Sequence, residues 1–543
     1  MLTRLHGGHV VDPATGTDKV ADVWFENGRI TTPDGRPADK DIDVSGHVVM
    51  AGAIDIHSHI AGGNVNTARL LLPELHRSIR GRLDGTPLST AKWSTYETGR
   101  LYAQMGFTTV VEPAMAPHHA LQTHYELAET PLLDTGALTV LGNDDYLLRM
   151  MRDGASQTAI EDYVALTVDQ TRSLGLKCIN PGGCEGFKEN MRVFGLDDEV
   201  PFYGVTSRQI FQTLQRATQK LGIHHPLHLH MNNLGIAGNI DTALATIDAA
   251  QGLPLHLAHV QFYAYGKEGK NGFSSAAAAF AEKINANKNV TVDIGAVMFS
   301  QTVTISSDVL KQFNSLSGGM PKKGAIFDGD ANGGGIVPYA YKVSNFYNAV
   351  QWIAGLELFL LVKDPAQVFF TTDHPNGGPF TSYPELFALL MSADIRAQWM
   401  SRLPAEALEG ALLPTLTREY TLQEIAVMSR SGAAKLFGFT DRGSLAPGSV
   451  ADIAVYKDQR DKAGMFRNAS LVFKDGAQIV DKGEVSHYVK GKTLRTRPQF
   501  DAAIEKRLDA YYDELYGLPR SVFQLPDAAL PNHDTFAEVS CRQ

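Results

Sequence analysis

The sequence predicts an α/β protein with a large (β/α)8 barrel and a small discontinuous β-sandwich domain, which the two ends of the chain build together. From residue 51 to residue 440, apolar extended runs alternate with helix-like stretches, the pattern of a parallel barrel. Strand-rich segments at 1–50 and 441–495 flank that middle part. The chain has 543 residues, more than one ordinary core holds, and residues 496–543 are left as a helical extension and tail.

The N-terminal segment contains short strands and turns that fit one half of the small domain. Asn27 and Gly28, inside the extended run 21–30, are a strong hairpin signal. Matching extended runs appear much later, at 443–456 and 472–485. The N-terminal pieces contain no reactive cluster, so we expect this β domain to be structural.

Eight apolar runs are candidate barrel strands. They are 48–56, 108–112, 137–141, 176–179, 226–230, 255–260, 290–294 and 368–373. A long insertion between the last two contains the glycine-rich run 329–335, which Pro338 follows instead of a helix, so a flexible lid or positioning loop is favoured over a phosphate site. The tail beyond the helical run 504–515 either docks on another subunit or forms a disordered end.

Composition and charge exclude several classes of protein. The net charge of −10 and a pI near 6.0 argue against nucleic acid as a partner. Three cysteines without a Cys-x-x-Cys pair indicate a reducing compartment. We find neither a signal peptide nor an apolar stretch long enough for a membrane span, and therefore expect a cytoplasmic protein.

The first barrel run ends in His57 and His59. In a strand, residues i and i+2 face the same side, so the two imidazoles project together and suit a zinc-class ion. Among 18 histidines such a pair can arise by chance. The Gly-Ala-Ile-Asp-Ile that precedes it makes the stretch resemble the first-strand signature of the amidohydrolase superfamily, and later strands should then supply further ligands.

The fourth run contains Lys177 among apolar residues. A bare buried ammonium is unfavourable, so this lysine must be neutralised, paired or modified. Carboxylation by carbon dioxide would turn it into an anionic bridge between two metal ions. The alternative is a lysine that reaches solvent or pairs with a carboxylate.

The fifth and sixth runs each offer two histidines. His228 and His230 face the same side of their strand, whereas His256 and His259 face opposite sides. Barrel active sites collect at the C-terminal ends of strands, which favours His230 and His259. The eighth run ends at Asp373, which either forms a turn or binds the metal and moves protons.

Six stretches are more specific than this strand-end pattern. They are 57–63 with 65–66, 102–109, 177 with 179–181, 228–235, 259–262 and 371–373 with 375–376. They resemble the alpha subunits of the formyltransferase/hydrolase complexes of methylotrophic bacteria and the corresponding subunits of formylmethanofuran dehydrogenases. The resemblance runs from residue 1 to roughly 490, with departures at Tyr263 and His374 that affect contacts around the ligands.

This resemblance implies a site and a reaction. The implied metal ligands are His57, His59, Lys177 as carboxylysine, His230, His259 and Asp373. Asp373 would also be the catalytic acid/base. The resemblance further implies one or two zinc ions and a substrate of the formylmethylofuran or formylmethanofuran type, cleaved to formate and the free furan-amine. Expected partners are a formyltransferase and the other subunits of such a complex.

Three other interpretations stay open. The same site could run in reverse, as it would within a formylmethanofuran dehydrogenase. A dihydropyrimidinase or hydantoinase would share every ligand, although the run from Asn232 to Gly235 argues against it and makes Asn232 a candidate for substrate binding. A non-catalytic scaffold is disfavoured by the intact ligand set.

A basic segment follows the first barrel run. It contains Arg69, Arg77, Arg80 and Arg82 in an otherwise acidic chain. Because furan-type carriers have glutamyl tails, as the resemblance implies, and arginine binds carboxylate bidentately, we expect these arginines to hold the anionic carrier. The alternative is a solvated helix face with ordinary ion pairs.

Overall fold

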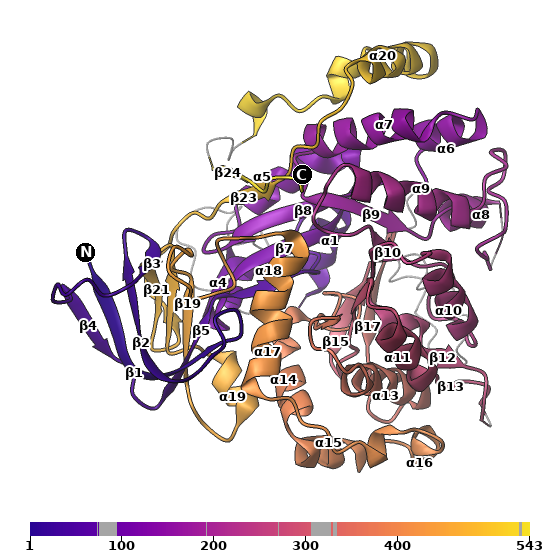
Figure 1. Cartoon of the computed structure of the whole chain (residues 1–543). Helices are drawn as coiled ribbons and strands as arrows, with labels where there is room; N and C mark the ends of the chain where they lie inside the picture. Colours follow the sequence, from indigo (N-terminus) through magenta and orange to yellow (C-terminus); the bar gives the residue numbers. More distant parts are fainter. Residues whose placement is uncertain are drawn as a thin grey trace.

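The computed structural model places a barrel beside a smaller β domain (Figure 1). It describes residues 1–72, 74, 95–189, 191, 193–269, 271–305, 327–329, 334–530 and 535–542. Arg77, Arg80 and Arg82 lie outside the described residues, as do residues 330–333 of the glycine-rich run, so the predictions for them stay predictions.

The small domain is one hydrogen-bonded sheet to which both ends of the chain contribute. Its central junction pairs β5 and β19 antiparallel, with Ala51 opposite Ile453. Its described strands follow the order β22 (Glu484–Val485), β21 (Ala477–Asp481), β20 (Leu471–Lys474), β19 (Ile453–Lys457), β5 (His47–Ala51), β1 (Thr3–Asp12), β2 (Thr17–Glu26) and β3 (Arg29–Thr31), with β4 (Lys40–Asp43) on β1.

In the described part of the chain, the barrel sheet has eight parallel strands in chain order. They are β6 (Ala53–Asp55), β7 (Phe107–Met115), β8 (Asp134–Val140), β9 (Gly175–Ile179), β10 (His228–His230), β11 (Leu255–Leu257), β14 (Val290–Asp293) and β18 (Val368–Phe369). The first and last strands meet just beyond their ends, where Ser58 bridges His374 and the His59 backbone N–H donates to the His374 carbonyl at 2.9 Å. The barrel therefore closes at the position of the predicted ligands.

The run 48–56, predicted as one strand, is divided between the two domains. β5 ends at Ala51 in the small domain, and β6 begins at Ala53 in the barrel. Gly52 lies between them, so close to Thr108 that a Cβ would be 2.2 Å from its Oγ1. His57 and His59 consequently follow β6 rather than lying within it.

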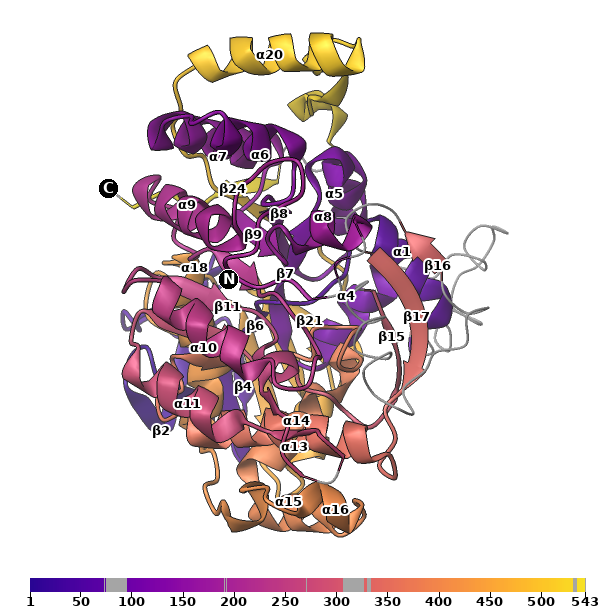
Figure 2. The same cartoon turned by 90° about the vertical axis from the view of Figure 1, so that its right-hand side faces the viewer.

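Helices cover the outside of the barrel (Figures 1 and 2). After the successive strands come α1 (Gly63–Ala68), α4 (Thr95–Gln104), α5 (Ala120–Ala128), α6 (Asp145–Arg152), α7 (Gln157–Gln170), α8 (Gly183–Lys188), α9 (Ser207–Lys220), α10 (Ile240–Ala249), α11 (Ala277–Ala286), α13 (Phe346–Leu361) and α14 (Tyr383–Met391). Then follow α15 (Ala393–Met400), α16 (Ala405–Leu408), α17 (Leu422–Ala426), α18 (Gly432–Phe437) and α19 (Lys462–Arg467). Over the described ranges, none of these helices is long and apolar enough to cross a membrane.

The insertion and the tail add further elements. Before α13, the insertion forms a small sheet of β15 (Gln301–Thr304), β17 (Gly334–Ala340) and β16 (Phe327–Gly329). The tail contains α20 (Ala503–Tyr516), which lies over α6 and α7 (Figure 1). Unexpectedly, β23 (Thr493–Arg495) pairs with β8, and β24 (Phe536–Glu538) adds a parallel strand beyond it. The C-terminal segment is thus part of the barrel sheet.

Candidate metal centre

Two histidines and an aspartate converge where the barrel closes. The Nε2 atoms of His57 and His59 lie 3.0 and 3.2 Å from Oδ1 of Asp373. All three side chains are buried, and their ligand atoms lie within 4.8 Å of one another. Imidazole nitrogen and carboxylate oxygen are the ligands that zinc-class ions take in proteins. This group can therefore hold a divalent ion.

The remaining predicted ligands lie on the neighbouring strands. Lys177 is in β9 and His230 ends β10, while His259 follows β11. The imidazole centroid of His259 lies 4.5 Å from that of His230 and 5.6 Å from that of His57. Lys177, His230 and His259 all line one pocket with His59 and Asp373. The structure thus brings the six predicted ligands together.

Four atoms of this group are buried and have no hydrogen-bond partner among the described residues. They are His57 Nε2, His259 Nδ1, Lys177 Nζ and Asp373 Oδ1. Buried polar atoms are nearly always satisfied in folded proteins. A set of unsatisfied nitrogen and oxygen donors aimed at one place fits a bound metal ion.

Backbone geometry brings His259 and Asp373 close together. Both have positive φ angles, 36° for His259 and 51° for Asp373, a region that non-glycine residues rarely adopt. Gly295 lies between them, and a Cβ there would be 2.4 Å from the His259 Cβ and 3.5 Å from the Asp373 Cβ. Only glycine leaves room for this approach.

Two carboxylates that the sequence did not single out fix the imidazoles. Asp293 Oδ2 lies 2.9 Å from His57 Nδ1, and its Oδ1 accepts the His259 backbone N–H at 2.6 Å. Glu112 Oε1 lies 3.0 Å from His59 Nδ1. With Nδ1 held in this way, the Nε2 atoms of both histidines are free to face a metal. The sequence signal that could have found both carboxylates is a charged residue near the end of each predicted apolar strand.

Electrostatics favour an ionised Asp373 and a cationic His59 before metal binds. Burial opposes ionisation of Asp373, but His259 and His57 hold its pKa well below the usual range. Burial also opposes protonation of His59, yet Glu112 and Asp373 outweigh it and raise the pKa of His59 to about 9. A metal ion bound at His59 would have to displace this proton.

Lys177 is different, because burial dominates. Burial lowers the pKa of its ammonium to about 8, against the opposing influence of the Asp293 and Asp373 carboxylates. With this pKa, about a tenth of the amine is neutral at pH 7. The neutral amine is the form that can react with carbon dioxide.

His228 and His256 occupy other places than His230 and His259. His228 Nε2 faces His57 Nδ1 at 3.1 Å, and its Nδ1 faces His225 Nε2 at 3.0 Å. His256 lies between Asp293 and Thr291, with Nε2 3.0 Å from Oδ2 of Asp293. Neither lines the pocket, and burial lowers the pKa of both. These two histidines form a neutral support inside the barrel.

The two positions that depart from the family pattern lie beside the ligands. The Tyr263 ring stacks on that of His259, with centroids 5.8 Å apart, and its hydroxyl donates to the Met231 carbonyl at 2.7 Å. His374 follows Asp373 directly and accepts the Phe380 backbone N–H at Nδ1, at 3.2 Å. Both side chains are buried beside candidate ligands.

Two residues predicted to bind substrate are engaged elsewhere. Arg69 is only 2% exposed, donates to Glu126 at 2.8 Å and to the Ile60 carbonyl, and does not line the pocket. The amide of Asn232 contacts Ser207, Asn180 and the Pro181 carbonyl at 2.8–3.1 Å. These contacts do not support the predicted role of either residue.

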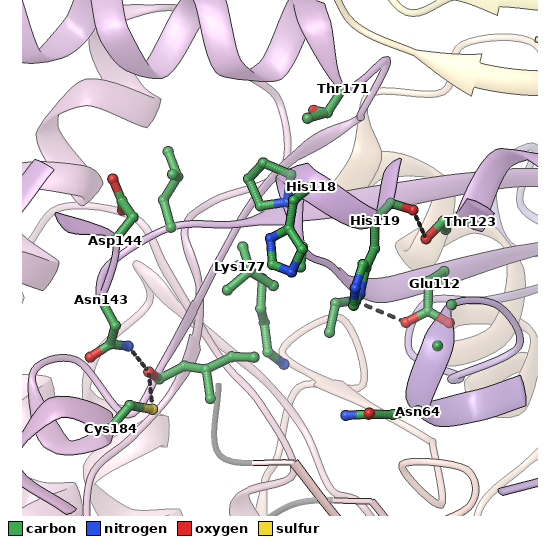
Figure 3. A pocket seen from close by; sticks show the side chains of 18 of the residues that line it. Asn64, Glu112, His118, His119, Thr123, Asn143, Asp144, Thr171, Lys177 and Cys184 are labelled. Atoms are coloured by element: carbon green, nitrogen blue, oxygen red, sulfur yellow. Dashed lines mark hydrogen bonds between the residues drawn. The ribbon is translucent and has the colours of Figure 1, made fainter. Parts of the chain in front are cut away.

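A cavity of about 480 Å³ leads outward from the candidate ligands. Lys177, His118 and His119 extend into the same space (Figure 3). Asn64, Asn143 and residues of α20 line it farther out. The site thus has a buried end with open donors and an outer end at the C-terminal segment.

Comparison with known proteins gives the family. A model described as the amidohydrolase family matches residues 40–480. The chain is 49% identical over 548 residues to the FhcA subunit of the formyltransferase/hydrolase complex of Methylorubrum extorquens, covering 100% of both chains. The crystal structure of that complex, FhcABCD with methylofuran, matches with a TM-score of 0.94 at 49% identity, again over 100% of both chains.

An archaeal relative extends the comparison. Protein FwdA of Methanocaldococcus jannaschii is 37% identical over 516 residues, covering 90% of each chain. The family model covers most of the chain. The protein belongs to the amidohydrolase family.

Proposed function

We propose that this protein hydrolyses the N-formyl amide of a furan-bearing one-carbon carrier, of the formylmethylofuran or formylmethanofuran type, to formate and the free furan-amine. The observation that carries this proposal is the buried, open set of donors at the strand ends. The carrier is proposed from the likeness to FhcA, whose complex was crystallised with methylofuran.

The donor set would hold zinc, as one or two ions. The proposed ligands are His57, His59, Lys177 as carboxylysine, His230, His259 and Asp373. When bound, such an ion lowers the pKa of water from about 15.7 to near 7 and polarises the carbonyl under attack. Asp293 and Glu112 would keep the His57 and His59 rings in orientation.

Asp373 is the proposed proton carrier. Its ionised carboxylate can accept a proton from the attacking water and deliver it to the amine nitrogen as the C–N bond breaks. Its position beside His57 and His59 keeps that carboxylate at the reacting end of the pocket. The protons balance, because one water molecule is added across one amide bond.

Lys177 can supply the bridging carboxylate. Its neutral amine would add to carbon dioxide, forming a carbamate and releasing one proton. A buried amine without a partner is unfavourable, and a carbamate would remove this cost because its oxygens could bind metal. This argument favours a carboxylated Lys177 over a Lys177 paired with a carboxylate.

We further infer that the chain assembles with a formyltransferase and companion subunits, as its relative does in the FhcABCD complex. The likeness to that relative covers the full length of both chains and therefore includes whatever surfaces make those contacts. The cytoplasmic location expected from the sequence stays a prediction.

Formate release from the formylated carrier tests the proposal. The protein, purified with its co-assembled subunits, should release one formate per free furan-amine formed, and a strong chelator should stop the reaction. If metal-replete protein leaves the formyl carrier intact while cleaving a cyclic amide such as dihydrouracil, the assignment is wrong.

A further inference from the structure

The insertion between β14 and β18 reaches the candidate metal centre through β15 and β17. These two strands pair antiparallel, with Thr302 opposite Tyr339. Ile305, which follows β15, and Tyr341, which follows β17, line the same cavity as Asp373. The insertion therefore forms part of the cavity wall on which the proposed proton carrier lies.

Asp373 begins a tight turn with an unusual backbone conformation. Its φ angle of 51° is one that residues with a side chain seldom adopt, and such a conformation persists where the surrounding structure enforces it. Within the turn, the Asn376 N–H donates to the Asp373 carbonyl at 2.7 Å. The Gly377 N–H donates to the Thr372 carbonyl at 2.9 Å. These bonds close the turn, but contacts from other segments must fix where it lies.

The insertion supplies such contacts. The Tyr341 hydroxyl donates to the Asn376 carbonyl at 2.9 Å, and the Ile305 backbone N–H donates to Asn376 Oδ1 at 2.8 Å. The Thr302 hydroxyl donates to the Pro375 carbonyl. All of these residues are buried. These three hydrogen bonds join the insertion to the residues two and three positions after the proposed proton carrier.

The same strands pack against the segment that follows the first two candidate ligands. Val303, Ile305 and Ile336 form one buried apolar cluster with side chains of α1. Figure 2 shows β17 beside α1, which comes soon after His57 and His59 in the chain. The insertion is therefore anchored on both sides of the place where the barrel closes, at α1 and at the turn of Asp373.

The Asp373 carboxylate depends on this support for its direction. Its Oδ1 atom contacts the Nε2 atoms of His57 and His59, which are themselves candidate ligands. Since a metal ion would replace those contacts, the backbone of the turn must set where the carboxylate points. Misplacing a reacting group by about 1 Å can lower a rate by about 100-fold.

We propose that Thr302, Tyr341 and Asn376 are positioning residues, through which the insertion orients the Asp373 carboxylate for metal ligation and proton transfer. The inference rests on the proposed function and deepens it. The three residues act through the main chain of the turn and not on the reacting amide. The insertion is then a part of the catalytic unit.

Turnover of the formylated carrier by the zinc-loaded protein, purified with its co-assembled subunits, tests this role. Thr302→Val/Tyr341→Phe removes two hydroxyl donors with little change in volume. We expect kcat to fall about 100-fold because the turn can then shift, while KM and zinc content stay parental. Thr302→Ser/Tyr341→Phe returns one hydroxyl and should recover part of the loss.

Tyr339→Phe is the matched control. The ring centroid of Tyr339 lies 4.8 Å from that of Tyr341, but its hydroxyl accepts from Asn348 Nδ2 at 3.0 Å, and Tyr339 does not line the cavity. This variant loses a tyrosine hydroxyl from the same insertion without touching the turn. It should keep the parental kcat and KM.

Cobalt in place of zinc provides a readout that needs no substrate. Because Asp373 is a proposed ligand, the visible spectrum of the cobalt-loaded double variant should differ from that of the parent. The spectrum of cobalt-loaded Tyr339→Phe should match the parent. A contact that only stabilises the fold would leave both spectra unchanged.

Four results would overturn the positioning role. They are a parental kcat in the double variant, a parental cobalt spectrum, a loss of kcat that follows loss of zinc or of folded protein, and a raised KM with parental kcat, which would make Tyr341 a substrate contact. Failure of the proposed function is distinguishable, because the parent would then release no formate while the cobalt spectra still separate the variants.

Discussion

Lys177 and Lys474 are both buried, but at opposite ends of the barrel. Lys474 Nζ lies 3.2 Å from carboxylate oxygens of Asp134, Asp452 and Asp475, where the small domain meets the start of β8. Burial opposes its charge, yet these carboxylates raise its pKa. Lys177 Nζ has no hydrogen-bond partner among the described residues, and burial lowers its pKa to about 8.

The difference separates a charge that stabilises the fold from an amine that suits the proposed chemistry. At the Lys474 end, Arg442 joins the lysine in contacting Asp134, so the buried charges largely satisfy one another. At the Lys177 end, the protein leaves donors open and keeps an amine partly neutral at the carboxyl ends of the strands. Such unsatisfied polar groups are costly for folding and are kept where chemistry needs them.

The largest expected effect comes from Lys177→Met. We expect formate release to fall by roughly 1000-fold or more, because the ligand set loses a member. Stability should stay the same or rise, since an unpaired buried amine is removed. The test measures turnover, metal content and a denaturant melt on one preparation. Parental activity with a full metal complement would make Lys177 structural.

The converse change, Lys474→Met, should act on folding. Removing this cation leaves carboxylates buried without their partner, and we expect the free energy of unfolding to drop by about 3–5 kcal/mol. Metal content per folded chain should be unchanged. The double variant Lys474→Met/Asp134→Asn should recover part of the loss. A stable Lys474→Met variant would contradict the structural role.

Asp293→Asn tests whether the Asp293 carboxylate orients the His57 ring. Its Oδ2 orients His57, and loss of such a carboxylate typically weakens metal affinity by about 10–100-fold. Thr291→Val is the matched control, because the Thr291 hydroxyl contacts the far nitrogen of His256, at 2.9 Å, and the change should leave affinity alone. Competition with a chromophoric chelator measures both, and equal affinities in the two variants would exclude an orienting role.

The smallest effect concerns acid stability at the Lys474 end. Burial opposes ionisation of Asp134, but Lys474 and Arg442 lower its pKa to about 2. A carboxyl group with a lowered folded-state pKa stabilises above its unfolded pKa of about 3.9 and loses that contribution as the pH falls through the folded value. Between about pH 4 and pH 2 this amounts to about 2 kcal/mol.

Asp134→Asn isolates that contribution in the metal-free protein. The variant should be less stable than the parent at pH 6, and the gap should narrow as the pH falls toward 2. Urea melts at several pH values measure it. A gap that is constant with pH would mean that the Asp134 carboxylate has no lowered pKa.

The sequence predicted the barrel correctly, and the placing of the candidate ligands has a local reason. His57, Lys177, His230 and Asp373 each lie in or directly after an apolar run, and parallel strands bring such positions to one edge. The choice of His230 over His228 followed from the same rule. In the structure, His230 lines the pocket and His228 does not.

What the sequence did not reveal depends on contacts between distant segments. The division of the first run follows from Gly52 packing on Thr108. The pairing of β23 and β24 with the barrel, and the engagement of Arg69 by Glu126, likewise need the folded chain. The contact of Tyr511 in α20 with Asp145 at the start of α6 likewise joins distant segments.

Zinc titration of the metal-stripped protein tests the central claim most directly. Formate release from the formylated carrier should return in proportion to bound zinc and stop at one or two ions per chain, whereas His57→Ala should neither retain zinc nor regain activity. Formate release that persists after complete metal removal, or His57→Ala with parental zinc content and turnover, would contradict a catalytic metal at this site.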